Sequence, residues 1–287
     1  MVAVANHPDG TGRSGALLAA KRSASRLANA PVAAAGSTGR GVALAVSVLR
    51  YSVQDTLTGR LPVGEFIWQA WVLFKVTATP AVLMAIPIGG IVTVVVSGLV
   101  EQVGATALLG AASGVGVLRQ GAPVTAGLLM GGAAASAIAS DFGARAIREE
   151  LDAMRVLGVD PVRRLVVPRF LALLLIAPML TLVIIVSGTA SAFLLSVTVS
   201  DVAPGSFWNS FGTFAKMTDV YFAIGKGLVF AAIVAVISSL RGMEAKGGPR
   251  GVADAVNAAV VINVILILFA NLIITQISTM FFPTAVA

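Results

Sequence analysis

Two basic residues lie inside long apolar stretches of this sequence, and they are the first candidates for chemistry. Arg119 interrupts the apolar stretch 105–140, and Lys226 lies inside the apolar stretch 220–240. A charged side chain within a membrane costs on the order of a few kcal/mol unless it faces a cavity or a partner. Both positions therefore indicate a site that could bind an anionic group. The simpler alternatives are a side chain that extends to the headgroup region and a buried ion pair.

The segment 145–157 is the most charged passage of the chain, and its spacing is helical. Ile147, Leu151 and Met154 fall on one face, with charged residues around the rest of the helix. Gly158 and Pro161 follow, where a C-terminal cap and a helix stop are expected. We expect a short helix at the water face that offers a charged surface to a soluble partner. The alternative is an ordinary solvated loop helix.

Several other kinds of chemistry are excluded by the residues present. The chain has no cysteine, and its single histidine, His7, lies near the beginning of the sequence. The sequence Gly225-Lys226-Gly227 lacks the upstream glycine and the serine or threonine of a phosphate-binding P-loop. The sequence shows no metal-ligand spacing and no nucleophile–base pairing. We therefore expect no enzyme activity, no metal and no cofactor in this chain.

The composition indicates an all-α integral membrane protein. Of 287 residues, 57% are hydrophobic and 11% are charged, whereas soluble domains contain about 25% charged residues. Five stretches are long and apolar enough to cross a membrane, and the second is interrupted near residues 119–123, where Gly121 and Pro123 weaken the helical hydrogen bonds. The expected spans are 76–100, 105–140, 170–197, 220–240 and 256–277.

Three further segments are expected around these spans. Residues 1–40 are rich in alanine, serine and glycine, and we expect a disordered cytoplasmic tail. Residues 41–73 combine basic and aromatic side chains with a moderate apolar content, which is typical of a helix in the headgroup plane. Between the third and fourth spans, 198–219 carries phenylalanines on one helical face. We expect an outer-face helix there, as an interfacial anchor or as a docking surface.

The distribution of basic residues predicts the orientation in the membrane. Of 20 lysine and arginine residues, eight lie in 1–75, six in 145–169 and three in 241–250. These segments are alternate gaps between the apolar stretches, and basic residues are enriched in cytoplasmic loops. We therefore expect a multi-pass protein of the cell membrane with a cytoplasmic N-terminus and an outer C-terminus. The same placement argues against nucleic acid as the partner of the net charge of +7.

One long motif resembles a known family. The run EELDAMRVLGVDPVRRLVVPRF, residues 149–170, is similar to the signature loop of the MlaE/YrbE permeases, the membrane subunits of ABC-type lipid transporters. The similarity continues through Ser206-Phe207-Trp208, Gly225-Lys226 and Gly242, and covers residues 65–280. Within this family the chain looks most like a B-type YrbE subunit of an actinobacterial Mce lipid-import system.

The resemblance implies a permease domain at 74–280 that moves lipids or fatty acids across the cell envelope. A separate cytoplasmic ABC ATPase dimer would bind ATP and Mg²⁺, and Mce (MlaD-like) proteins would bind the lipid substrate. The helix at 145–157 would be the coupling helix that contacts the ATPase. The site residues that the resemblance implies are Arg119, Gln120 and Lys226 for the lipid cavity, and Glu149, Glu150, Asp152, Met154, Arg155 and Asp160 for ATPase coupling.

The sequence also departs from the family pattern. Gln120 stands where glutamate is usual, and Ala133 stands where arginine is common. These losses favour a heterodimer with a second, more typical YrbE-type permease. Two other functions stay open, namely an ion-coupled secondary transporter gated by Arg119 and Lys226, and a structural membrane anchor of an envelope complex. The transporter would need an acidic residue deep in a span, and the sequence shows none. The anchor leaves the two cations unexplained.

Overall fold

The computed structural model describes residues 39–58 and 63–281. The chain divides into two compact units, Met1–Val46 and Ser47–Ala287. In the first unit the described residues, 39–46, are helical. The tail expected at 1–40 lies outside the described residues, except for its last two, which belong to that helix. The second unit contains the elements discussed below, apart from residues 39–46 of the first helix.

The described part of the second unit consists of helices and short connections, with no strand among the described residues, so the expected all-α architecture is confirmed. A helix at 39–57 continues into this unit. The elements after it are α2 (Val63–Gln102), η1 (Thr106–Leu108), α3 (Leu109–Gly116), η2 (Val117–Gly121), α4 (Ala122–Leu129), η3 (Met130–Ala134), α5 (Ala135–Ile147), α6 (Glu150–Val156), η4 (Val162–Val166), α7 (Val167–Thr198), α8 (Pro204–Phe214), α9 (Met217–Met243) and α10 (Pro249–Phe281).

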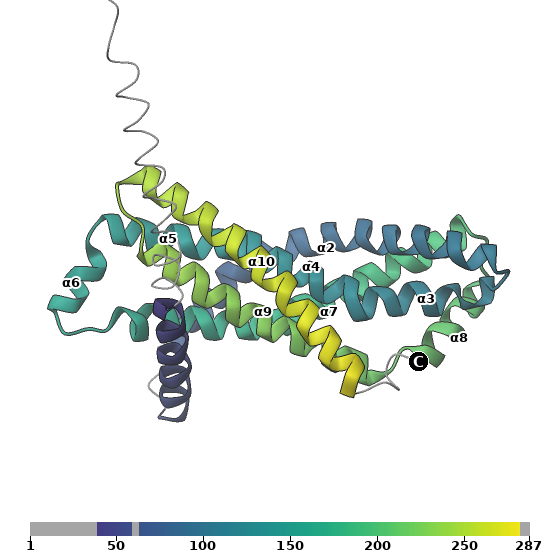
Figure 1. The fold of residues 1–287 in the computed structure, drawn as a ribbon, viewed down its shortest axis with the longest axis horizontal. Helices are drawn as coiled ribbons and strands as arrows, with labels where there is room; N and C mark the ends of the chain where they lie inside the picture. Colours follow the sequence, from purple (N-terminus) through teal and green to yellow (C-terminus); the bar gives the residue numbers. More distant parts are fainter. Residues whose placement is uncertain (1–38, 59–62, 282–287) are drawn as a thin grey trace, which may run out of the picture. The chain divides into compact units, whose positions relative to one another are not determined.

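Five helical runs among the described residues are long and apolar enough to cross a membrane, which confirms the five expected spans. The shortest has 27 residues and reaches about 40 Å, more than the ~30 Å of a hydrocarbon core. The runs are Val63–Gln102, Thr106–Ile147, Val162–Thr198, Met217–Met243 and Pro249–Phe281. In Figure 1, α6 lies at one end of these runs and α8 at the other. We call these two regions the α6 end and the α8 end.

The second run is continuous, but π-helical turns replace its α-helical hydrogen bonding at η2 and η3. The interruption expected near residues 119–123 is the first of these turns, not a break in the helix. Pro123 explains its place, because proline has no N–H to donate to the carbonyl of Arg119, four residues earlier. That carbonyl instead accepts a hydrogen bond from Lys226 Nζ at 3.3 Å. A backbone irregularity thus brings two distant basic residues together.

The single helix expected at 41–73 is wrong in its bounds. One helix covers 39–57, and residues 63–73 form the first turns of α2. The sequence between the two helices contains Gly59 and Pro62, and proline disfavours a helical backbone in the residue before it. Residues 63–73 therefore belong to the first long run.

The helix expected at 145–157 is also wrong in its bounds. α5 continues to Ile147, and α6 begins at Glu150. Between them Glu149 has a left-handed backbone with a φ of 60°, which cannot continue a right-handed helix. The apolar spacing of the sequence runs on through this turn, so periodicity did not locate it.

A stripe of small residues lets three helices approach one another closely. The stripe runs along α4, η3 and α5 and consists of Gly127, Gly131, Ala135 and Ala139. A Cβ added to Gly131 would lie 2.9 Å from the Ile267 side chain of α10, and one added to Gly127 would lie 2.7 Å from the Phe230 side chain of α9. Small residues at such positions are typical of membrane helix contacts. The stripe is a packing surface.

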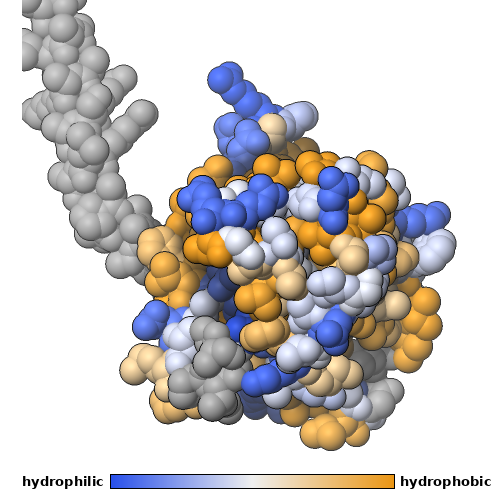
Figure 2. Space-filling model, turned by 90° about the vertical axis from the view of Figure 1, so that its right-hand side faces the viewer, coloured by the Kyte–Doolittle hydropathy of each residue, from blue (hydrophilic) through white to orange (hydrophobic). Residues whose placement is uncertain are grey.

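At the α8 end, α8 packs against α3 and α7 through aromatic side chains. Phe207 is fully buried and meets Phe193 of α7 edge to face, with ring centroids 5.3 Å apart. Trp208 is half exposed and contacts Phe211. Figure 2 looks at this end and shows hydrophilic and hydrophobic residues side by side. Aromatic residues beside polar ones are typical of a membrane–water boundary.

Candidate functional site

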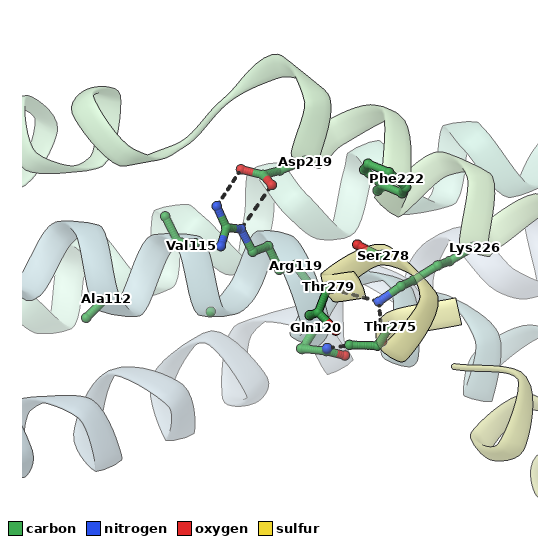
Figure 3. Close-up of a pocket in the computed structure, with 11 residues that line it drawn as sticks. Ala112, Val115, Arg119, Gln120, Asp219, Phe222, Lys226, Thr275, Ser278 and Thr279 are labelled. Carbon is green, nitrogen blue, oxygen red and sulfur yellow. Dashed lines mark hydrogen bonds and ion pairs between the residues drawn. The ribbon is translucent and has the colours of Figure 1, made fainter. Parts of the chain in front are cut away.

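A cavity of about 380 Å³ lies among α3, η2, α9 and α10 (Figure 3). Arg119 lies in the first half of the second run, Lys226 in the first half of α9, and Thr275 near the end of α10. All three positions are therefore nearer to the α8 end than to the α6 end. Ala112, Val115 and Phe222 add an apolar wall.

Arg119 is held by a carboxylate from another helix. Its Nε donates to Asp219 Oδ1 at 2.9 Å and its Nη2 donates to Oδ2 at 3.3 Å. The Asp219 side chain is 4% exposed, whereas the Arg119 side chain is 23% exposed. Asp219 also accepts a hydrogen bond from the backbone N–H of Lys216 at 3.1 Å, which fixes it at the first turn of α9. This two-point contact orients the guanidinium and offsets its charge.

Lys226 has a different environment, although it lines the same cavity. Its Nζ donates to Thr275 Oγ1 at 2.8 Å and to the carbonyl of Arg119 at 3.3 Å (Figure 3). Both acceptors are neutral. Among the described residues, no carboxylate forms an ion pair with Lys226. Its ammonium group is therefore a buried cation with no ion-pair partner among the described residues.

Gln120 joins the same hydrogen-bond network from the second run. Its Nε2 donates to Thr275 Oγ1 at 3.3 Å, and its Oε1 accepts from Asn271 Nδ2 at 3.3 Å. Thr275 therefore links Gln120 to Lys226. Gln120 is exposed, so this wall of the cavity reaches the surface of the chain. The structure thus brings together the three residues that the sequence assigned to one cavity, while their role in binding stays a prediction.

The charges and donors of the cavity define what it could hold. Its described lining carries two cations, Arg119 and Lys226, and one carboxylate, Asp219. Hydroxyl groups from Thr275, Ser278 and Thr279 add neutral donors. The described residues contain no cluster of histidine, cysteine or acidic side chains that could hold a metal ion. One anionic group with an apolar tail fits this lining better than a cation or a metal does.

Asp219 is the residue of this site that sequence reasoning missed. The expected outer segment 198–219 placed it outside the spans, but α9 begins at Met217 and buries its carboxylate. Asp219 lies in the first turn of α9, at the end of that span and not deep within it, so the expectation about acidic residues deep within a span is not contradicted. One signal was available, because an acid in the first turn of a helix is a common cap. A second was that Arg119, inside an apolar run, needed a partner.

The residues expected to couple to an ATPase lie at the α6 end, far along the helices from the cavity. Leu151 is buried and Met154 is half-buried, so the apolar face of α6 turns towards the rest of the chain. Glu149 is exposed. Asp152 and Arg155 form an exposed ion pair at 2.6 Å. These three charged residues line a cleft of about 460 Å³, together with Lys246 and two glycines of the α9–α10 connection.

Two further coupling residues expected from the sequence, Glu150 and Asp160, also have partners within the chain. Glu150 pairs with Arg148 at 2.9 Å and lies 3.7 Å from Arg145. Asp160 Oδ1 accepts a hydrogen bond from the backbone N–H of Val162 at 2.9 Å, which caps the helical turn that follows. These contacts indicate local structural roles for Glu150 and Asp160, whereas, among the described residues, Asp152 and Arg155 pair only with each other at the exposed surface of α6.

Known proteins are similar to this chain over the same region. The family model described as Permease MlaE matches residues 66–277. A probable ABC transporter permease protein of Synechocystis sp. is 33% identical over 184 residues, which are 64% of this chain and 70% of that protein. The chloroplast protein TRIGALACTOSYLDIACYLGLYCEROL 1 of Arabidopsis thaliana is 34% identical over 158 residues, 55% of this chain and 45% of that protein.

A third relative carries a more specific name. The intermembrane phospholipid transport system permease protein MlaE of Haemophilus influenzae is 29% identical over 170 residues, 59% of this chain and 65% of that protein. The matched part is less than two thirds of the Haemophilus protein and less than two thirds of the Arabidopsis protein. The family match is longer: it begins in α2 and ends in α10, and it includes α6 and every lining residue of the cavity except Ser278 and Thr279. The chain is therefore a multi-pass membrane protein that belongs to the MlaE permease family.

Proposed function

We propose that this chain is the permease subunit of an ABC-type transporter that moves an anionic lipid, such as a phospholipid or a fatty acid, across the cell envelope. The environment of Lys226 is the observation that carries the proposal. Its ammonium group lines a cavity of about 380 Å³ and donates to neutral oxygens. A phosphate or carboxylate headgroup would supply the missing negative charge, and the apolar wall would contact the acyl chain.

The residue at position 120 strengthens the preference for an anion. Gln120 stands where the family resemblance leads us to expect a glutamate, and it shares Thr275 with Lys226. A glutamate in that place would put a carboxylate near the ammonium group and reduce the excess positive charge. With glutamine, the cavity keeps two cations against one acid. The headgroup then becomes the natural counter-ion of Lys226.

The functional unit in our proposal is a heterodimer of two YrbE-type permeases within an Mce system. Gln120 is exposed, and α10 buries a smaller share of its residues than the other long helices. A second permease against this face would close the cavity on the side that this chain leaves open. The losses at Gln120 and Ala133 support a partner that supplies the missing polar groups.

The energy source in our proposal is a cytoplasmic ABC ATPase dimer, which binds ATP and Mg²⁺ and contacts α6. This assignment places the α6 end and the N-terminus in the cytoplasm, and the α8 end and the C-terminus outside. Mce (MlaD-like) proteins would then exchange lipid with the α8 end, which is the nearer end to the cavity. The name of the Synechocystis relative, a probable ABC transporter permease protein, supports this scheme over an ion-coupled secondary transporter.

The test is lipid transfer by the complex purified from its native membrane. We expect an ATPase to co-purify, and we expect the reconstituted complex to move a fluorescent anionic phospholipid between vesicles only when ATP is added. Lys226→Met should reduce this transfer at least tenfold, the size expected when a hydrogen bond to a charged group is lost, without changing the amount of bound ATPase. Lys226→Arg should retain most of it.

Lys75→Met is the matched control. Lys75 is an exposed lysine of α2 whose ammonium group lies 5.0 Å from the centroid of the Trp71 ring, outside the cavity, so its loss should leave transfer unchanged. Transfer driven by an ion gradient without ATP would favour a secondary transporter. Normal transfer by the Lys226→Met complex would place the lipid site elsewhere.

A further inference from the structure

The α6 end contains a series of charged contacts that connects three helices. Glu150 of α6 lies 3.7 Å from Arg145 of α5, and Arg145 Nε contacts Asp141 of the same helix at 3.3 Å. Asp141 in turn forms an ion pair with Arg169, near the start of α7. The exposed helix α6 is therefore connected through α5 to the interior of the bundle.

Arg169 is the inner end of this series and is held tightly. Its side chain is 3% exposed, and its guanidinium lies 4.3 Å from the centroid of the Phe142 ring, which is fully buried. The carboxylate of Asp141 and the ring of Phe142 both belong to α5, so they fix Arg169 from one helix. A movement of α5 should therefore displace Arg169, and with it the start of α7.

A third helix is within electrostatic reach of the same guanidinium. Glu65, in the first turn of α2, interacts electrostatically with Arg169, and Gln69 holds Glu65 by a hydrogen bond of 2.7 Å. Arg169 Nη1 is buried and has no hydrogen-bond partner among the described residues. Arg169 therefore keeps one N–H donor without a hydrogen bond in the described residues. Its positive charge interacts with acidic side chains of both α5 and α2.

From Arg169 a close packing contact leads along α7 to the cavity. α7 packs against α9, and a Cβ added to Gly227 would lie 2.8 Å from Thr181 Oγ1 of α7. Gly227 directly follows Lys226 in α9. A shift of α7 at this height therefore displaces the helix that carries the cavity lysine, because packed helices transmit strain and do not absorb it.

We propose that Arg145, Asp141 and Arg169 are positioning residues that transmit a displacement of α6 to α7, and through α7 to the cavity. This inference rests on the proposed function, because it takes α6 as the contact site of the ATPase. Coupling between distant sites is carried by packed side chains and ion-pair networks of this kind. Through these contacts, a displacement of α6 by the ATPase would shift α9 and so move Lys226 within the cavity.

The experiment measures the coupling ratio, the amount of lipid transferred per ATP hydrolysed, in the complete reconstituted complex. Arg145→Gln breaks the series at a side chain that is 31% exposed, and it leaves the buried Asp141–Arg169 pair intact. We expect the ratio to fall about fivefold, within the range that single residues of a coupling network contribute, while ATPase binding and hydrolysis stay near wild type. Arg145→Lys should recover most of the ratio.

Arg241→Gln is the matched control. Arg241 has a side chain 29% exposed and pairs with Glu244 at the same end of the molecule, outside the series, so its loss should leave the ratio unchanged. An unchanged ratio in Arg145→Gln, or an equal fall in both variants, would overturn the inference. A wild-type complex that transfers no lipid with ATP would instead overturn the proposed function.

Discussion

Two of the arginine–aspartate pairs that join different helices, one beside the cavity and one at the α6 end, differ in which partner is buried. In the cavity, the acid Asp219 is 4% exposed and the cation Arg119 is 23% exposed. At the α6 end, the cation Arg169 is 3% exposed and the acid Asp141 is 40% exposed. In the first pair the fixed partner is the carboxylate, and the cation borders an open space. In the second pair the buried partner is the cation, and the half-exposed acid also pairs with Arg145.

The difference shows how one kind of ion pair can serve two purposes. A buried acid holds Arg119 in a set orientation beside a cavity, where a ligand can approach the guanidinium and Lys226. A buried cation that lies over the ring of Phe142 and pairs with Asp141 ties α5 to α7. The first arrangement is suited to recognition, and the second is suited to holding two helices in register.

The largest effect is expected from removing the acid of the pair at the α6 end. Asp141→Ala would leave Arg169 buried without its ion-pair partner, and breaking a buried pair in this way costs about 3–5 kcal/mol of unfolding free energy. Arg169→Met should cost less, because Asp141 is half exposed and keeps Arg145. Unfolding in mixed micelles, followed by circular dichroism, measures both values. Equal losses of unfolding free energy in the two variants would contradict the difference in burial between Arg169 and Asp141.

The next effect concerns binding, not stability. Lys226→Met should weaken the binding of an anionic phospholipid by about 1.5–3 kcal/mol, roughly tenfold to a hundredfold in Kd. The unfolding free energy should stay near wild type, because methionine removes a buried charge that has no ion pair in the described residues. Fluorescence titration with short-chain lipids measures the Kd. A neutral-headgroup lipid is the control, and equal weakening for both lipids would count against a charge contact.

A smaller effect would sharpen the contrast between the two pairs. Asp219→Asn should release the Arg119 charge into the cavity and tighten the binding of the same anionic lipid by about 1 kcal/mol, roughly fivefold. Asp141→Asn, at the other pair, should leave this Kd unchanged. The same titration measures both variants. Equal changes in the two variants would mean that Asp219 acts only through the fold.

The smallest effect on stability is expected at the exposed surface of α6. The double substitution Glu149→Lys, Asp152→Lys should change the unfolding free energy by about 0.5 kcal/mol or less, because both side chains are exposed. It should nevertheless abolish retention of the ATPase in a pull-down, while the permease still reaches the membrane. Met154→Asp, on the half-buried face, is the comparison and should harm folding instead. Retention of the ATPase by the double variant would leave α6 as an ordinary solvated helix.

The sequence by itself determined the five long apolar runs, the amphipathic α6 and the two cations inside apolar stretches. These features follow from composition and from spacing along one helix, which are local properties of the chain. The family resemblance also came from a continuous run of residues, and the family match confirms it at the level of MlaE permeases. The YrbE subtype stays a prediction, because the family match is to MlaE permeases in general, and the partners stay predictions, because they are other chains.

The tertiary structure alone decided which residues meet. Arg119 and Asp219 are 100 positions apart, and no periodicity in the sequence connects them. The same holds for Arg169 and Asp141, which lie on different helices. The turn at Glu149 depends on one backbone angle, and it leaves the apolar spacing on both sides intact. Helical spacing places residues on a face, but the packing of the helices decides which face meets which, and therefore which charges are paired and which stay open to a ligand.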